Sequence, residues 1–231
     1  AVNQRGQHHP ADVLSMADLF LDEFNGPPGS VVGHDAGGGH VWAAPFAGGD
    51  RLLLSGFGSL MPPAGYGDAQ IRIPELAGQP EYEIEMRFGG PLSDIIEVEY
   101  GAQSVGDLMP GNFYINISNT GCSVRWYTED PNQNFTWPES IVEDTTILFR
   151  FTSGSVPRLS VFFEGNLAFS YGASDRTMDD HIWKMATSSD SDMNLLSFRA
   201  GTPTPPEPSD FWTAFVGTRA TIGDPAPPSE A

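Results

Sequence analysis

The sequence contains a single cysteine, Cys122, among its 231 residues, so no disulfide bond can form within the chain. This excludes the small extracellular folds that a disulfide framework holds together. Cys122 lies in the apolar alternation Cys122-Val124-Trp126, which predicts a small buried core residue. The chain needs no such framework, because a chain of this length buries roughly 70% of its unfolded surface.

Basic residues are also scarce. Eleven lysines and arginines stand against 30 acidic residues, the formal net charge is −19, and Lys184 is the one lysine. A surface this acidic repels phosphate backbones and anionic lipids, which argues against binding to nucleic acid or to a membrane surface. Two explanations of the charge stay open: plain solubility, or a partner surface that is basic or depends on cations.

Long apolar runs are lacking. No stretch approaches the ~18 apolar residues that a membrane helix needs. The first twenty residues contain no basic segment followed by an apolar one, the pattern of a secretory signal. We therefore expect a protein that is made and folded in a cytoplasm.

The chain is rich in short segments whose apolar and polar residues alternate, and turn residues separate them, since it has 26 glycines and 20 prolines. The clearest strand candidates are 81–88, 112–118, 121–128, 146–152, 158–172 and 194–201, with shorter ones at 40–44, 51–56 and 69–73. Segments with one apolar and one polar face are typical of two packed antiparallel sheets. The sequence therefore predicts an all-β, two-sheet antiparallel sandwich over 20–201.

Different patterns flank this region. Val13, Met16, Ala17 and Phe20 have helical spacing, which predicts a short helix over 11–21 within an N-terminal arm, 1–19. Residues 202–231 are rich in proline and predict an extended tail. An apolar cluster in this tail suggests that it docks on neighbouring subunits, through Phe211, Trp212, Phe215 and Val216.

The stretch 22–42 gathers acidic and histidine residues among glycines. His34 and His40 are separated by a triple glycine that fixes no ligand geometry, so we expect no metal there. Six residues of the stretch form a motif, in this order along the chain: Asp22, Phe24, Gly29, His34, Gly39 and Trp42. This order resembles the opening of concanavalin A-like lectin/glucanase jelly-roll domains of the kind found in bacteriophage virion structural proteins. The resemblance implies a first strand and a loop that fastens the two sheets, with the Asp and His side chains incidental.

Three carboxylates, Glu81, Glu83 and Glu85, share one face of the strand predicted at 81–88. Retaining glucanases of the same superfamily carry a similar acidic strand, and paired carboxylates can act as nucleophile and acid. Here the middle acid is Glu where that pattern has Asp. A plain polar strand face, or a non-catalytic polar groove, explains the row as well, so we expect no catalytic residue.

Aromatic residues stand beside amides and acids over 125–140. Sugar recognition uses this combination, because rings stack on pyranose faces while polar groups take the hydroxyls. The candidate carbohydrate-binding residues are Tyr114, Arg125, Tyr127, Asn132, Asn134 and Trp137. Tyr114 and Arg125 should share the outward hairpin face with Tyr127. A long loop that folds on its own aromatics is the alternative.

Aspartates are dense over 174–181 and 188–194, and their oxygens could hold Ca²⁺. Neither segment has the spacing of a known calcium loop, so we expect solvated turns, with no metal and no cofactor.

The resemblance, the soluble disulfide-free body and the adhesive ends together predict a non-enzymatic structural protein of a bacteriophage virion. It would be a capsid decoration, tail or fibre component, made in the host cytoplasm. Its partners would be other virion proteins, copies of itself and a host surface glycan. A carbohydrate-binding, receptor-binding lectin-like module is the alternative, and a glucanase-like hydrolase is the third hypothesis.

Overall fold

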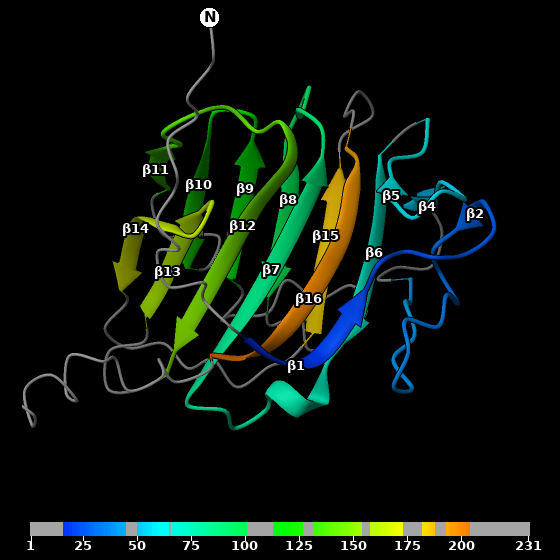
Figure 1. Ribbon diagram of the computed structural model, residues 1–231, viewed down its shortest axis with the longest axis horizontal. Coiled ribbons are helices and arrows are strands. Elements are labelled where there is room, and N and C mark those ends of the chain that lie inside the picture. The colour runs from blue at the N-terminus through cyan, green and yellow to red at the C-terminus, as the bar shows by residue number, and fades with distance from the viewer. Residues whose placement is uncertain are drawn as a thin grey trace, which may run out of the picture. The chain divides into compact units, whose positions relative to one another are not determined.

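Two β-sheets pack face to face, as the two-faced strands require (Figure 1). The computed structural model describes residues 16–44, 50–64, 66–100, 113–126, 132–153, 158–172, 182–187 and 193–203. Within these ranges the one helix is a single 3-10 turn, η1 (Pro74–Leu76). The predicted all-β jelly-roll sandwich of two antiparallel sheets is confirmed. None of the described ranges holds a helix with the length and hydropathy that crossing a membrane requires.

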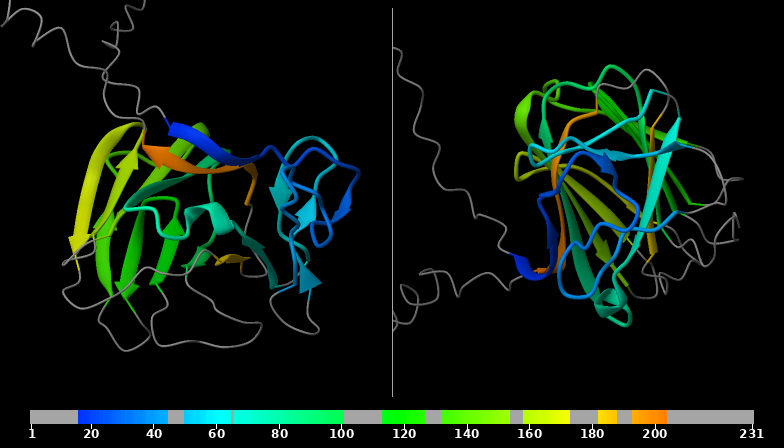
Figure 2. Two further views of the ribbon diagram at one scale, coloured as in Figure 1. Left: turned by 90° about the horizontal axis from the view of Figure 1, so that it is seen from below. Right: turned by 90° about the vertical axis from the view of Figure 1, so that its right-hand side faces the viewer.

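The larger sheet has nine strands and contains the first and the last strand of the described chain. Its order is β14 (Asn166–Gly172), β13 (Arg158–Phe163), β12 (Glu143–Thr152), β7 (Glu81–Gly89), β16 (Leu195–Pro203), β5 (Leu60–Met61), β4 (Leu53–Leu54) and β2 (Gly29–Ser30). In addition, β1 (Met16–Asp22) pairs with β16. The short strands β2, β4 and β5 lie at the opposite end of the sheet from β13 and β14 (Figure 2).

The smaller sheet has seven strands. Its order is β11 (Gln133–Thr136), β10 (Gly121–Trp126), β9 (Phe113–Ser118), β8 (Ile96–Tyr100), β15 (Ile182–Thr187), β6 (Gly67–Arg72) and β3 (Asp50–Arg51). Every neighbouring pair in it is antiparallel except β3 and β6, which are parallel. Because β8, β15 and β6 come from distant parts of the sequence, this sheet joins residues that are far apart along the chain.

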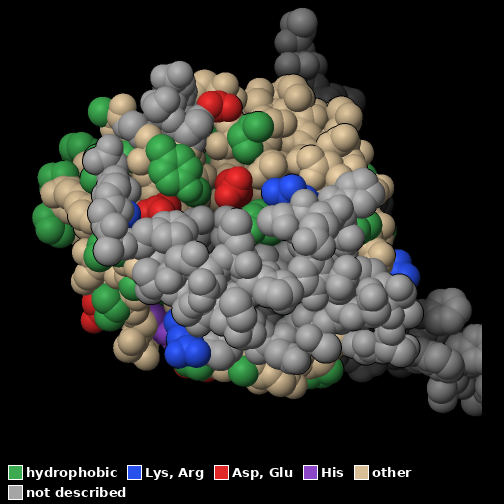
Figure 3. Space-filling model, turned by 180° about the vertical axis from the view of Figure 1, so that it is seen from behind, with side chains coloured by type: hydrophobic (Ala, Val, Ile, Leu, Met, Phe, Trp, Pro, Cys, Tyr) green, Lys and Arg blue, Asp and Glu red, His purple; other side chains and the backbone are tan. Residues whose placement is uncertain are grey.

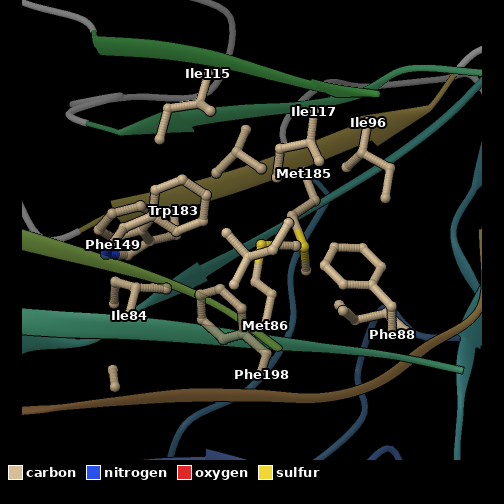
Figure 4. Packing of buried hydrophobic residues seen from close by; sticks show 14 of the residues in the cluster. Ile84, Met86, Phe88, Ile96, Ile115, Ile117, Phe149, Trp183, Met185 and Phe198 are labelled. Carbon is tan, nitrogen blue, oxygen red and sulfur yellow. The ribbon is translucent and has the colours of Figure 1, made fainter. Parts of the chain in front are cut away.

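The core lies between the sheets (Figure 4). Fully buried side chains of the nine-stranded sheet face those of the seven-stranded sheet: Ile84, Met86, Phe88, Phe149 and Phe198 against Ile96, Ile115, Ile117, Trp183 and Met185. Cys122 is buried in this core, as predicted, and its burial raises the pKa of the thiol. The residues between these positions point away from the core, so each sheet also has an outer face.

Residues 16–22 form the strand β1, so the helix predicted over 11–21 is wrong in its described part. The strand pairs with β16, where Phe20 lies opposite Ala200, and the Phe20 ring packs edge-on against Phe198 at 6.1 Å. The apolar spacing fits either structure, and pairing with β16 decides it because it provides backbone hydrogen bonds as well as burial. Residues 1–15 lie outside the described residues.

Other sequence predictions were incomplete, wrong, or concern residues outside the described ranges. The strands β8 and β15 were not predicted, and the short strand predicted at 40–44 is replaced by two isolated bridges, Asp35 to Val41 and Ala43 to Gln70. The four docking candidates of the tail, Phe211, Trp212, Phe215 and Val216, lie outside the described residues. Their role stays a prediction.

In the hairpin of β9 and β10, the first residue of β10, Gly121, has no room for a side chain. A Cβ placed on Gly121 would overlap the carbonyl oxygen of Phe135 on the neighbouring strand β11. We expect Gly121→Ala to lower the free energy of unfolding by about 2–3 kcal/mol, because the backbone must shift. Gly90→Ala is the control, since a Cβ on Gly90 meets no atom within 4 Å. Equal urea-unfolding midpoints for the two variants would contradict this packing.

Candidate functional site

Asp22 is the centre of the motif found at 22–42, and it is buried. Its Oδ1 accepts a hydrogen bond from the Phe24 backbone N–H at 2.7 Å, and its Oδ2 accepts one from the Trp42 indole N–H at 2.7 Å. His34 Nε2 lies 3.2 Å from Asp22 Oδ1 and donates to it when that nitrogen carries the proton. The expectation that the Asp and His side chains are incidental is therefore wrong, because they hold the loop.

The same motif ties the loop to the core through its rings. Trp42 is 1% exposed, and its ring lies 5.9 Å from that of Phe24 and 6.0 Å from that of Phe198 on β16. Phe24 itself has a left-handed backbone, φ 53°, which the hydrogen bond to Asp22 supports. Asp22 and His34 thus have a structural role. Among the described residues, no group of three or more His, Cys, Asp or Glu side chains is arranged to hold a metal ion.

The acidic row Glu81, Glu83 and Glu85 lies on the outer face of β7, where arginines of the neighbouring strands meet it. Arg150 of β12 donates from Nε to Glu83 Oε1 at 2.6 Å, and its Nη2 also contacts this oxygen. Arg150 Nε lies 3.6 Å from Glu81 Oε1, and Arg199 Nη1 of β16 lies 3.5 Å from Glu85 Oε1. The row therefore forms a cross-strand ladder of opposite charges.

Glu83 is the most unusual member of this ladder, because its side chain is fully buried on an outer face. Burial raises its pKa above the ordinary value, although the hydrogen bond and the charge of Arg150 oppose that shift. Glu83 Oε2 has no hydrogen-bond partner in the described part of the chain. The ladder accounts for the acidic strand as a structural feature. That the protein is not an enzyme stays a prediction.

The outer face of the seven-stranded sheet carries a different arrangement, a row of polar side chains in register across four strands. Asn134 lies opposite Ser123, Ser123 opposite Asn116, and Asn116 opposite Glu97. Residues that lie directly opposite in antiparallel strands point to the same side. Because strands are about 4.8 Å apart, this polar row spans roughly 14 Å. It presents an amide, a hydroxyl, a second amide and a carboxylate in one line.

Beyond Glu97, the same register leads to a buried ion pair at the other edge of the sheet. Glu97 lies opposite Ala186, Ala186 opposite Asp68, and Asp68 opposite Arg51. Arg51 Nη1 lies 2.8 Å from Asp68 Oδ1, and the two side chains are 15% and 4% exposed.

A second row runs beside the first. Arg125 of β10 lies opposite Tyr114 of β9, and its guanidinium lies over the Tyr114 ring, 4.7 Å from the ring centre. The register confirms that these two side chains share a face, as predicted. Tyr114 is buried although it points away from the core cluster. An aromatic ring capped by a cation therefore lies one row from Ser123 and Asn116.

Among the described residues, Asn116 is the member of the polar row whose side-chain acceptor is unsatisfied. Its Oδ1 is buried and has no hydrogen-bond partner in the described part of the chain. A buried acceptor without a partner costs free energy relative to one that is hydrogen-bonded. Figure 3 looks at this side of the molecule, where acidic and basic side chains lie close to one another.

The other predicted sugar-binding residues are scattered. Trp137 is buried, its indole donates to the Ser118 carbonyl at 3.1 Å, and its ring stacks on Phe163 of the other sheet at 5.5 Å. Trp137 therefore presents no open ring, and the expectation that it does is wrong. Asn132 and Asn134 are exposed, but Asn134 alone belongs to the polar row. Tyr127 lies outside the described residues.

Two of the described aromatic residues of 125–140 pack on rings of the other sheet, and not on one another. Phe135 stacks on Phe169 of β14, with ring centres 3.5 Å apart, and Trp137 lies 6.4 Å from the same ring. These aromatics fold against the opposite sheet and close one end of the sandwich. Most of the aspartate-rich segments 174–181 and 188–194 lies outside the described residues.

Sequence reasoning missed four polar residues that the structure brings together: Ser123, Asn116, Glu97 and Asp68. Parity along β9 and β10 indicates that Asn116 and Ser123 point outward with Tyr114 and Arg125. Their alignment with Glu97 and Asp68 depends on which strands are neighbours, and no single segment contains that information.

Known structures share this fold. No family model matches the chain, and no curated protein sequence matches it. The metal-free exoplasmic/lumenal domain of VIP36 is 11% identical with a TM-score of 0.54, and the match covers 83% of this chain and 95% of that one. Its Ca²⁺/Man-bound form matches at 10% identity and a TM-score of 0.52, over 83% and 93%.

The metal-free carbohydrate recognition domain of Emp46p is 12% identical with a TM-score of 0.51, over 80% of this chain and 99% of that one. A carbohydrate esterase of the Shiga toxin-encoding bacteriophage phi24B matches at 11% identity, over 82% and 100%, and its TM-score of 0.49 is too low to support a conclusion. The fold is that of concanavalin A-like lectin domains, as the motif at 22–42 predicted.

Proposed function

We propose that the chain is a lectin-like carbohydrate-binding module that binds glycans on the outer face of its seven-stranded sheet. One observation carries this proposal: the polar row of Asn134, Ser123, Asn116 and Glu97 crosses four strands in register. Amide, hydroxyl and carboxylate groups in a line match the hydroxyls along a sugar chain, since each of them can donate or accept a hydrogen bond.

Two further features support a sugar as the ligand. The buried Asn116 Oδ1 has an unused acceptor position within the described part of the chain, and sugar hydroxyls are donors. The net charge of −19 disfavours anionic ligands and leaves neutral glycans well tolerated. The similar solved domains include a carbohydrate recognition domain and a Man-bound form, which is consistent with this use of the fold.

The test is binding of the purified chain to an array of neutral oligosaccharides built from glucose, mannose, galactose and N-acetylglucosamine. The variant Asn116→Ala with Ser123→Ala removes two hydrogen-bonding groups from the centre of the polar row. At about 1 kcal/mol for each lost hydrogen bond, we expect binding to weaken roughly thirty-fold.

The matched control is Ser160→Ala with Asn166→Ala, which removes one hydroxyl and one amide from the nine-stranded sheet. It should bind like the wild type, and the melting temperatures of both variants show that the fold is kept. Equal weakening in the two double variants would contradict the position of the site. A wild-type protein that binds no glycan on the array would contradict the function itself.

The wider role predicted from the sequence, a structural component of a bacteriophage virion, stays a prediction. Such a particle could carry this module to a host surface glycan, in which case the two proposals describe one protein. The apolar cluster of the tail, Phe211 to Val216, would then attach the module to neighbouring subunits. Deleting residues 202–231 should release the protein from its particle, and unchanged incorporation would contradict this role.

A further inference from the structure

The turn between β4 and β5 presents one aromatic side chain to solvent. Phe57 is 95% exposed, whereas the next most exposed large apolar residue among those described, Leu167, is 60% exposed. Single exposed apolar residues are common and need no explanation. Phe57 differs because the turn that carries it is closely braced.

Hydrogen bonds fix the shape of this turn. The backbone N–H of Ser55 donates to the Ser59 carbonyl at 2.9 Å, and the two hydroxyls are joined by a hydrogen bond of 2.9 Å. The Phe57 N–H donates to Ser55 Oγ at 3.0 Å. Gly56 and Gly58 take left-handed backbone angles, φ +82° and +77°, which glycine adopts without strain.

The turn also rests on the preceding loop. A Cβ on Gly56 would lie 2.9 Å from Pro28 Cδ, so this glycine is packed against the proline ring. A Cβ on Gly58 would lie 3.4 Å from Asn25 Oδ1 and 3.6 Å from the Glu23 carbonyl. The backbone on both sides of Phe57 is thus held in place, so the turn itself loses little conformational entropy when the ring binds a ligand.

Apart from Pro28, which packs on Gly56, the neighbours of the turn are polar or very small. Both flanking residues are glycines, which leave the two faces of the ring uncovered by adjacent side chains. Asn25 and Glu23 are exposed beside the turn, and the Asn25 amide lies 3.4 Å from Glu23 Oε2. An open ring with an amide and a carboxylate nearby is the arrangement that holds a pyranose, whose apolar face stacks while its hydroxyls form hydrogen bonds.

A protein pocket is the other ligand that an exposed aromatic could enter. Such anchors are usually the centre of a wider apolar patch, with polar groups at its rim. Here Pro28 packs on the turn, but the other contacts of the turn are with the Asn25 amide and the Glu23 backbone carbonyl, so a sugar fits the surroundings better.

We infer that the Phe57 turn is a second sugar-contacting surface, in which the Phe57 ring stacks on a pyranose and Asn25 and Glu23 take its hydroxyls. This inference rests on the proposed glycan binding and adds a site on a different part of the molecule. The ligand class is a neutral oligosaccharide.

The experiment measures dissociation constants by calorimetry, with oligosaccharides of two to six glucose, mannose, galactose or N-acetylglucosamine units as probes. The variants are Phe57→Ala, Phe57→Tyr and the control Leu167→Ala, which truncates an exposed apolar side chain on another hairpin. Loss of one stacked ring should weaken binding roughly five- to ten-fold. Phe57→Tyr keeps the ring and should bind like the wild type, and so should Leu167→Ala.

The outcomes separate the two sites. Weaker binding in both Phe57→Ala and the Asn116/Ser123 double variant supports both proposals. Weaker binding only in the double variant overturns the Phe57 inference and leaves the proposed function standing. Weaker binding only in Phe57→Ala supports the inference and moves the site away from the polar row. If the turn instead anchors a protein partner, Phe57→Ala will leave every glycan affinity unchanged. That result also overturns the inference.

Discussion

Replacing Asp22 by alanine is expected to lower the free energy of unfolding by about 4 kcal/mol. The substitution removes the acceptor for the Phe24 N–H and the Trp42 indole N–H, and both groups stay buried. Each buried donor without an acceptor costs about 1–3 kcal/mol. The contact with His34 Nε2 is lost as well. Asp22 should therefore be among the most sensitive single positions of the chain.

Urea unfolding followed by tryptophan fluorescence measures this effect. Asp22→Asn keeps the size of the side chain and one acceptor oxygen, so we expect an intermediate loss. Glu139→Gln is the control, because it makes the same change from acid to amide at an exposed position and should lie within about 0.5 kcal/mol of the wild type. A loss below about 1 kcal/mol in Asp22→Ala would show that the motif does not hold the loop.

Replacing Arg150 by methionine is expected to lower the free energy of unfolding by about 3–5 kcal/mol at pH 7.5. The change leaves the fully buried Glu83 carboxyl group without its ion-pair partner, which is far more costly than losing the pair as a whole. The double variant Arg150→Met with Glu83→Met should recover most of the loss, because two apolar side chains replace the two charges. This double variant tests the charge explanation directly.

The exposed pair in the same sheet supplies the control. Arg87 Nη2 lies 2.7 Å from Asp144 Oδ1, and the two side chains are 50% and 63% exposed. Arg87→Met should therefore lose less than about 1 kcal/mol. Equal losses in Arg150→Met and Arg87→Met would contradict the importance of burial at Glu83.

The same variant has a defined pH dependence. Burial raises the pKa of Glu83 in the folded protein, and the hydrogen bond and charge of Arg150 lower it, so removing Arg150 raises it further. A carboxyl group whose pKa is raised by folding favours the folded state most below its ordinary pKa, and this contribution is lost as the pH rises through the folded value. The deficit of Arg150→Met should therefore shrink between pH 7.5 and pH 5, and a constant deficit would contradict it.

The sequence predicted the strands well where one residue pattern sufficed. In 81–88, every second residue is apolar, and those residues fill the core as expected. The helix predicted over 11–21 failed at β1, because a short apolar spacing fits two structures and the partner β16 lies near the other end of the described chain. Local patterns cannot choose between them without that partner.

For the candidate site, too, local sequence patterns could predict only contacts within one hairpin. The alternation of inward and outward residues along β9 and β10 predicted that Tyr114 and Arg125 share one face. The contact between their side chains agrees with that prediction. Parity could not place Trp137, because the chain turns after β11 and its backbone N–H donates to the Thr120 carbonyl at 2.9 Å, which directs the ring into the core. Predicting the polar row would also have required knowing which strands lie beside β8 and β15, and only the folded sheet defines that order.

The two outer faces of the sandwich are chemically different. On the nine-stranded sheet, the acidic residues of β7 form ion pairs with arginines of β12 and β16, although Glu83 Oε2 has no hydrogen-bond partner in the described part of the chain. On the seven-stranded sheet, Asn116 keeps a buried acceptor without a partner in the described part of the chain. The proposed binding is assigned to the smaller sheet because the polar row of Asn134, Ser123, Asn116 and Glu97 lies there, in register across four strands.

Backbone amide chemical shifts, recorded by NMR while a glycan identified on the array is added, test the central claim most directly. The account predicts that the largest shifts lie on β8, β9, β10 and β11, around Glu97, Asn116, Ser123 and Asn134, with a second group at the Phe57 turn. Shifts confined to the nine-stranded sheet, or no shifts at saturating glycan, would contradict it.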